Sequence, residues 1–238
     1  PKVSNFRRHI GPMLVFFIPS VAVSLYKVMD KIMLGAMTDT AQVGYYENSE
    51  KIINISLGFV TALGTVMMPR LTHLLASGHE GEGKQLFQKS SGFILIFSYA
   101  MAFGIAGVSG VFPAVFWGEE FTPCGILLAG LAVSLPFTAF AHVIRTQYLS
   151  PRHRDRAFIG SVCAGAAVNF VMNLLCIPRW QAFGAVVGTV AAEAAVCLIQ
   201  IFAVRKEEKM GRYLLASLPF LPFGAGMGTL VYLIGLWS

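Results

Sequence analysis

The sequence predicts an all-α fold: a polytopic membrane helix bundle of about seven transmembrane helices. Hydrophobic residues make up 55% of the 238 residues and charged residues only 13%, whereas a soluble domain carries about 25% charged residues. Apolar stretches that reach the length of about 20 residues needed to span a bilayer recur along the chain. Basic residues gather in alternate gaps between these stretches. Together, composition, length and charge pattern predict a membrane protein.

Seven apolar stretches are predicted to span the membrane, at 12–35, 43–68, 91–117, 124–148, 157–177, 183–204 and 213–236. The sequence lacks the alternating strands of about 10 residues that a membrane barrel requires. The glycine-rich stretch 77–83 is predicted to be a loop. An odd number of spans is unusual for a complete bundle, and the chain begins with Pro1. We therefore expect this chain to be a part of a longer protein.

The connections between the spans alternate in charge. Fourteen basic residues fall before span one and in every second connection, whereas the remaining connections hold a single basic residue, Arg179, together with Asp39, Glu119 and Glu120. The positive-inside rule places the basic connections and residue 1 in the cytoplasm. The net charge of +6 is thus explained by membrane topology, and no nucleic-acid partner is expected.

The first two spans contain clusters of charged and polar residues at helical spacing, and these clusters are Lys27, Asp30 and Lys31, followed by Glu47, Glu50, Lys51 and Asn54. Each cluster occupies one helix face. A charge at the centre of a membrane helix costs at least about 2.5–3.5 kcal/mol. These groups therefore either neutralise one another and lock two helices together, or line a wet cavity for a polar solute. Thr61 and Thr65 extend the polar face and favour the cavity.

Further polar groups are embedded in spans five and six. Asn169 and Asn173 lie four residues apart on one helix face and are suited to hydrogen bonding between helices. A buried carboxylate such as Glu193 becomes protonated or finds a partner, so Glu193 is a candidate proton or cation site. The pairs Gly184 with Gly188 and Gly224 with Gly228 have the spacing of close helix packing.

No pattern in the sequence predicts catalysis, a metal site or a cofactor. The five histidines form no HExxH motif or other close pair, and the glycine pairs lack the strand and GK[ST] sequence of a phosphate-binding loop. We therefore do not expect an enzyme. A membrane-embedded glycan transferase, which uses scattered Asp and Arg residues, stays open as the alternative from the enzyme class. A purely structural membrane subunit is a further alternative.

The first ninety residues carry a family resemblance. The runs SLYKVMDKIMLG (24–35) and VGYYENSEKIINISLGFVTALGTVMMPRLT (43–72) resemble the oligosaccharide flippases of bacterial polysaccharide biosynthesis, of the O-antigen and teichoic-acid type. These flippases belong to the multidrug/oligosaccharidyl-lipid/polysaccharide flippase superfamily. The matching motifs are D-K-x-M-L-G, G-Y-Y-E-x-x-x-K-I and T-x-x-x-P-R, and they cover two helices.

The resemblance implies a protein of two six-helix bundles that works by alternating access in the bacterial cytoplasmic membrane. Residues 1–210 would form the second bundle, residues 211–238 an additional transmembrane helix, and the first bundle would be missing from this chain. The implied substrate is an oligosaccharide linked to undecaprenyl diphosphate. A peptidoglycan lipid-precursor flippase and a multidrug or cation antiporter of the same superfamily are the alternatives.

The resemblance also implies roles for the embedded charges. Lys27, Lys31 and Lys51 would attract the diphosphate or an acidic sugar, while Asp30, Glu47 and Glu50 would tune these lysines and bind sugar hydroxyls. Arg70 would lie where the diphosphate enters from the cytoplasm. Ion coupling, common in this superfamily, would use Asp30 or Glu193.

Overall fold

The computed structural model describes residues 28–205, 210–217 and 219–235, and all regular secondary structure in these ranges is helical. Residues 28–37 are helical, and the rest of the predicted first span lies outside the described residues. The elements that follow are α2 (Thr40–Ala76), α3 (Glu80–Val108), α4 (Phe112–Trp117), η2 (Glu119–Phe121), α5 (Cys124–Ala132), α6 (Leu135–Ile144), η3 (Arg145–Leu149), η4 (Ser150–Arg152), α7 (Asp155–Val204), α8 (Met210–Ser217) and α9 (Phe220–Gly235). The predicted all-α bundle is confirmed.

The long helix α2 begins at a side-chain cap. The carboxylate of Asp39 accepts a hydrogen bond of 2.9 Å from the backbone N–H of Gln42, which satisfies a donor that the first helical turn leaves unpaired. The helix ends where Gly78 adopts a φ of 75°, a conformation that suits glycine. The helix therefore extends the predicted span 43–68 by three residues at its start and by eight residues, about two turns, at its end.

The loop predicted for 77–83 is wrong in its second half. Only residues 77–79 form a turn, and α3 begins at Glu80. Glu80 and Glu82 occupy the first turn of α3, where a carboxylate stabilises the helix dipole and outweighs the low helix propensity of the glycines. The predicted span 91–117 is also displaced, because α3 ends at Val108 and residues 112–117 form the separate helix α4.

The fourth predicted span is divided. Helix α5 ends at Ala132, and α6 begins at Leu135 with Pro136 in its first turn, where a proline costs no helical hydrogen bond. After α6 the chain continues into the π-helix η3 and the 3₁₀ helix η4. Rare π-helical turns are concentrated at functional sites.

Helix α7 is a hairpin of two helices. Gln181 has φ 50° and ψ −128°, which reverses the chain between the predicted spans 157–177 and 183–204 and confirms them as separate helices. The predicted close packing at Gly184 is also confirmed, since a Cβ atom there would lie 2.5 Å from the backbone carbonyl of Cys176. Arg179 lies at this turn.

Four described stretches are long and apolar enough to cross a membrane, namely Thr40–Ala76, Glu80–Val108, Cys124–Arg152 and the hairpin Asp155–Val204. Phe59, Val66, Phe93, Phe170 and Phe202 are exposed on these helices, as lipid-facing side chains of a membrane protein are. Helix α9 has 16 residues and packs along α3, where Gly224 and Gly228 both contact Phe103. The chain is a multi-pass membrane protein.

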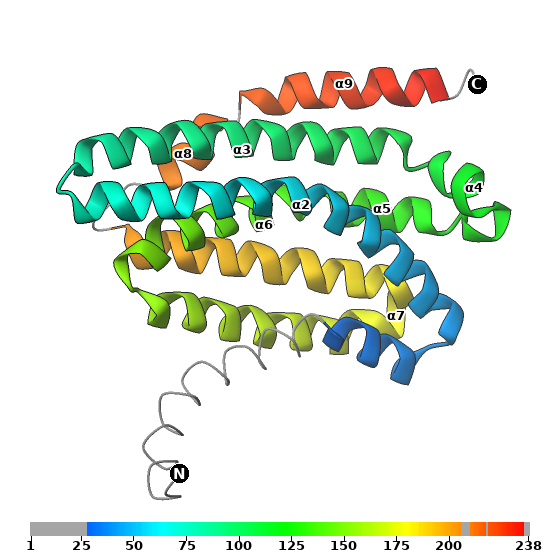
Figure 1. Cartoon of the computed structure of the whole chain (residues 1–238). Helices are drawn as coiled ribbons and strands as arrows, with labels where there is room; N and C mark the ends of the chain where they lie inside the picture. Colours follow the sequence, from blue (N-terminus) through cyan, green and yellow to red (C-terminus); the bar gives the residue numbers. More distant parts are fainter. Residues whose placement is uncertain (1–27, 206–209, 218, 236–238) are drawn as a thin grey trace, which may run out of the picture.

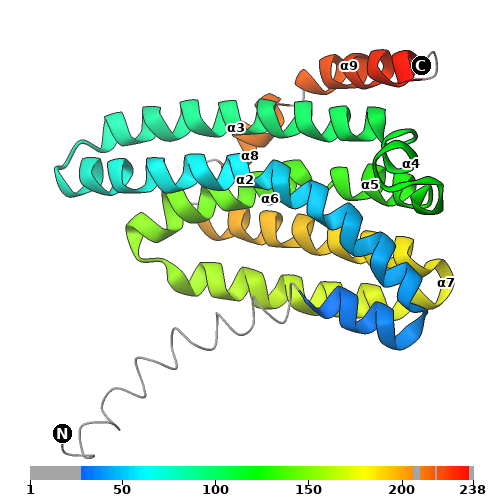
Figure 2. The same cartoon turned by 45° about the vertical axis from the view of Figure 1, so that its right-hand side comes forward.

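The helices run roughly side by side, with α9 and α3 on one side of the bundle and the α7 hairpin on the other (Figures 1 and 2). We call the left-hand end in Figure 1 the basic end. It holds the α2–α3 turn, η4 and the end of α7, and therefore Arg152, Arg154 and Arg205. The opposite end holds α4 and the α7 turn.

Candidate functional site

A cavity of about 440 Å³ lies between α2, the α5–α6 segment and both halves of α7, open to helix residues 28–37 at one end. The polar side chains that line it are Asp30, Glu50, Asn54, Thr61, Ser134, Thr138, His142, Arg145, Thr189, Glu193 and Gln200. Apolar residues such as Leu57 and Val196 separate these groups. A concave site with a few polar groups on an apolar wall is typical of ligand binding.

The most deeply buried charge in this cavity is Asp30, whose exposed fraction is 6%. One carboxylate oxygen accepts hydrogen bonds from the amides of Asn169 and Asn173, at 2.8 and 2.6 Å. The other accepts from the hydroxyls of Tyr46, at 3.0 Å, and Thr189, at 3.1 Å. Four donors therefore converge on this one carboxylate. Asp30 thus joins three helices through a single side chain.

The Asp30 cluster also has spare acceptor capacity. Asn173 Oδ1 is buried without a hydrogen-bond partner among the described residues, and it faces Gly188, where a Cβ atom would lie only 2.0 Å away. Gly188 therefore makes room for this amide. With Asp30, Asn169 Oδ1 and the Thr189 hydroxyl, the cluster offers several oxygen ligands in a small volume.

The other described charges of the first two predicted spans form two ion pairs. Lys31 and Glu50 are 2.9 Å apart, with exposed fractions of 29% and 24%. Lys51 and Glu47, one turn apart on α2, are 3.5 Å apart and are 61% and 43% exposed. The first pair links residues 28–37 to α2 and borders the cavity through Glu50. The second lies on the surface of a single helix.

The structure brings together only some of the predicted site residues. Asp30, Glu50, Asn54 and Glu193 line the cavity, but Glu47, Lys51 and the exposed Arg70 do not. The expectation that Asp30 tunes the lysines is not met within the described residues, because its partners there are amides and hydroxyls. Lys27 lies outside the described residues.

Sequence reasoning missed four residues of the site. Arg145 is one of the fourteen basic residues ascribed to the connections, and His142 lies near the end of the fourth predicted span, yet both line the cavity. Tyr46 and Thr189 were not considered, although both donate to Asp30. The signal that could have found Thr189 is its position one residue after Gly188, which belongs to a glycine pair predicted to pack closely against another helix.

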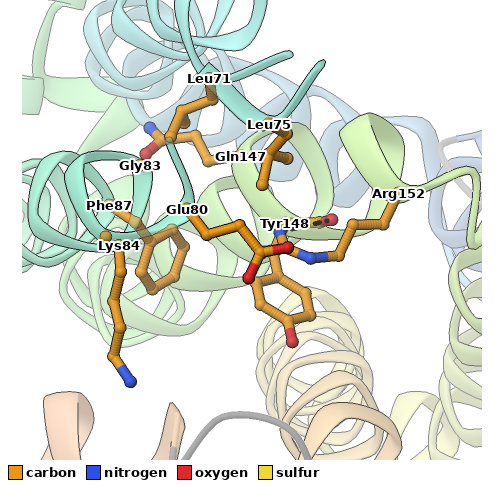
Figure 3. A pocket seen from close by; sticks show the side chains of 10 residues that line it. Leu71, Leu75, Glu80, Gly83, Lys84, Phe87, Gln147, Tyr148 and Arg152 are labelled. Carbon is orange, nitrogen blue, oxygen red and sulfur yellow. Dashed lines mark hydrogen bonds between the residues drawn. The ribbon is translucent and has the colours of Figure 1, made fainter. Parts of the chain in front are cut away.

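A second cavity, of about 460 Å³, opens at the basic end (Figure 3). Lys84, Arg152, Glu80 and Tyr148 surround its mouth, and Figure 3 shows the Glu80 carboxylate between the two basic side chains. The guanidinium carbon of Arg152 lies 3.9 Å from the centre of the Tyr148 ring. This cavity holds none of the predicted pathway residues, so the central cavity is the better candidate.

Within the described residues, no group of three or more His, Cys, Asp or Glu side chains is placed to hold a metal ion. The side chains of the central cavity are instead suited to binding a polar solute and a hard cation, because they combine carboxylates, amides, hydroxyls and one guanidinium.

Comparison with known proteins identifies related membrane transporters. A family model described as lipid II flippase MurJ matches residues 2–235. Curated relatives include a protein named as an O-antigen transporter from Shigella dysenteriae, with 22% identity over 80% of this chain and 47% of the relative. They also include one named lipid II flippase MurJ from Bacillus subtilis (strain 168), with 24% identity over 66% of this chain and 29% of the relative.

A relative named as a low-salt glycan biosynthesis flippase, from Haloferax volcanii, shares 21% identity over 79% of this chain and 40% of its own length. The chain thus spans less than half the length of these curated relatives. A solved structure titled lipid II flippase MurJ, inward closed conformation, aligns with a TM-score of 0.76 and 15% identity over 98% of this chain and 54% of that one. This likeness shows a shared fold.

Proposed function

This chain belongs to the lipid II flippase MurJ family, and we propose that the protein of which it forms a part moves a glycan linked to polyprenyl diphosphate across the cytoplasmic membrane of a bacterium. The observation that carries the proposal is the central cavity, in which Asp30, Glu50, Glu193 and Arg145 line one space between membrane-spanning helices. Several charges around one cavity are unfavourable in lipid and fit a polar cargo.

Two substrates of the same chemistry are candidates. The relative from Shigella supports an O-antigen type of oligosaccharide on undecaprenyl diphosphate, and the matching family model supports lipid II. Both carry a diphosphate and a chain of sugars, so both need cations and hydrogen-bonding groups in the cavity. The names of the relatives and of the family are those of transporters, which supports transport over glycan transfer.

Alternating access accounts for a cavity built from one bundle. Residues 1–210 would form one six-helix bundle with residues 211–238 as an additional helix, and a second bundle from the same full-length protein would face the cavity. The chain covers 54% of the structural neighbour, which supports such a partner bundle. We propose that the basic end faces the cytoplasm, since its basic residues obey the positive-inside rule.

We further propose that Asp30 binds the coupling ion. Four hydrogen-bond donors converge on its carboxylate, and a buried negative charge is stabilised by a cation. The oxygen atoms of Asn169, Asn173 and Thr189 are hard ligands of the kind that hard cations prefer. Glu193, four residues after Thr189 and on the wall of the same cavity, is the second candidate for proton or cation exchange.

Complementation tests the proposal. The full-length gene is expressed in two bacterial strains, one lacking its O-antigen flippase and one depleted of its lipid II flippase, and surface polysaccharide and survival are scored. Rescue of either strain is expected, and the strain that is rescued identifies the glycan. Failure in both strains at normal membrane abundance would contradict glycan-lipid transport. Lys31→Ala is expected to weaken rescue, because it leaves Glu50 unpaired beside the cavity.

A further inference from the structure

The cavity wall nearest the basic end carries two groups to which the proposed function assigns no individual role, His142 and Arg145. His142 lies in α6, and Arg145, three residues later, opens the π-helix η3. Residues three apart on a helix lie on the same face, and both side chains line the central cavity. The π-helical turn therefore begins at a residue that faces the cavity.

Arg145 brings a positive charge that no carboxylate neutralises within the described residues. Its guanidinium carbon lies 4.2 Å from the centre of the Phe158 ring, and the described salt bridges, Lys31 with Glu50 and Lys51 with Glu47, do not include it. Stacking on an aromatic ring fixes the guanidinium plane and leaves the N–H groups along its edge available. Those donors match the oxygens of a phosphate in a bidentate arrangement.

His142 adds a donor in the same place. Its Nε2 atom is buried and has no hydrogen-bond partner in the part of the chain that the structure describes. Gly64 of α2 makes room for the ring, since a Cβ atom at that position would lie 2.7 Å from Nε2. A buried nitrogen without a partner is unfavourable, and an anionic oxygen in the cavity would supply the missing partner.

We propose that His142 and Arg145 form a phosphate-binding subsite, which receives the diphosphate of the lipid-linked substrate. The identity of that substrate rests on the proposed function, whereas the anion chemistry rests on these two side chains. Lys31 and Lys51 are held by glutamates, so Arg145 is the cation best placed to bind a ligand among the described cavity residues. Asp30 and Arg145 thus divide the cavity into a cation site and an anion site.

Calorimetry on the purified full-length protein tests the subsite, with farnesyl diphosphate, farnesol and inorganic diphosphate as probes. We expect Arg145→Gln to weaken binding of farnesyl diphosphate at least tenfold and His142→Leu about threefold, while farnesol binding stays unchanged. Arg152→Gln is the matched control, because Arg152 also stacks on an aromatic ring but does not line the central cavity. It is expected to bind like the wild type.

Unchanged binding of farnesyl diphosphate by Arg145→Gln would overturn the subsite. Inorganic diphosphate that binds as tightly as farnesyl diphosphate would overturn the lipid as the source of the anion. Arg145→Lys keeps the charge and is expected to restore part of the affinity, and an unchanged thermal midpoint shows that each variant is folded. If Arg145→Gln exports glycan normally and binds farnesyl diphosphate like the wild type, the subsite is rejected and the flippase proposal stands. If the wild type binds farnesyl diphosphate through Arg145 but exports no glycan, the flippase proposal is rejected and the subsite stands.

Discussion

Asp30 accepts more hydrogen bonds than any other described side chain of the cavity, since Asn169, Asn173, Tyr46 and Thr189 all donate to its carboxylate. Asp30→Asn keeps the shape but removes the charge and one acceptor. We expect at least a tenfold loss of transport and loss of its dependence on the coupling ion, measured by export at equal membrane abundance with Na⁺ and pH varied.

Glu119→Gln is the control for this substitution, because Glu119 is exposed at the opposite end of the bundle from the basic residues. It also neutralises one carboxylate, and it is expected to transport like the wild type. Normal ion-dependent export by Asp30→Asn would contradict the assignment of the ion site.

The two ion pairs are predicted to differ in strength. A double-mutant cycle on Lys31 and Glu50, which are partly buried and link two helices, is expected to give a coupling free energy of about 1 kcal/mol. The cycle on Lys51 and Glu47, exposed on one helix, is expected to give at most about 0.5 kcal/mol. Both coupling free energies are measured by unfolding of the purified full-length protein. Equal coupling free energies would contradict the expectation that the partly buried pair is the stronger one.

At the scale of residues, the sequence predicted which charges are embedded but not how they pair. Helical spacing placed Asp30 and Lys31 on one face, yet Lys31 binds Glu50 while Asp30 binds amides and hydroxyls from α2 and α7. The α7 partners of Asp30 are more than 100 residues away in sequence, where spacing carries no information. Arg145 was not predicted as a site residue, because its basic neighbours suggested a connection.

At the scale of elements, the α7 hairpin depends on glycines that a larger side chain would disrupt. Gly184→Ala is expected to lower the thermal midpoint by several degrees, because a Cβ atom there would lie 2.5 Å from the backbone of Cys176, and two backbones cannot shift apart without loss of packing. The midpoint is measured on the purified full-length protein by loss of helical circular dichroism.

Gly160 of the same hairpin supplies the matched control. Among the described residues, nothing beyond the neighbouring turns of its own helix would lie within 4 Å of a Cβ atom at Gly160, so Gly160→Ala is expected to leave the midpoint unchanged or to raise it slightly through the better helix propensity of alanine. Equal midpoints for the two variants would argue against close packing of the two halves of α7.

Long apolar runs predicted the existence of the spanning helices, whereas their ends depended on local chemistry. The hairpin turn near Arg179 was predicted correctly because a charge and Pro178 interrupt an apolar run. The glycine-rich residues 80–83 were predicted as loop, but acidic residues in the first turn of α3 support a helix there. Hydropathy alone could not show that Gly118, with φ of 103°, ends α4.

At the scale of the whole molecule, the charge pattern predicts the orientation in the membrane. Cysteines introduced in the full-length protein by Ser77→Cys, at the basic end, and Glu119→Cys, at the opposite end, are treated with a membrane-impermeant maleimide on intact cells. The exposed Cys163 is first replaced by alanine. Labelling of position 119 but not of position 77 is expected, and the reverse pattern would place the basic end outside.

Flipping by the purified full-length protein in liposomes tests directly whether a glycan lipid is transported through the charged cavity. A fluorescent glycan linked to polyprenyl diphosphate is placed in the membrane, and its transfer between leaflets is followed by accessibility of the glycan to an added lectin. We expect fast transfer of the glycan lipid by the wild type, at least tenfold slower transfer by Asp30→Asn, and no transfer of phosphatidylcholine. Equal rates for wild type and Asp30→Asn, or for glycan lipid and phosphatidylcholine, would contradict transport through the charged cavity.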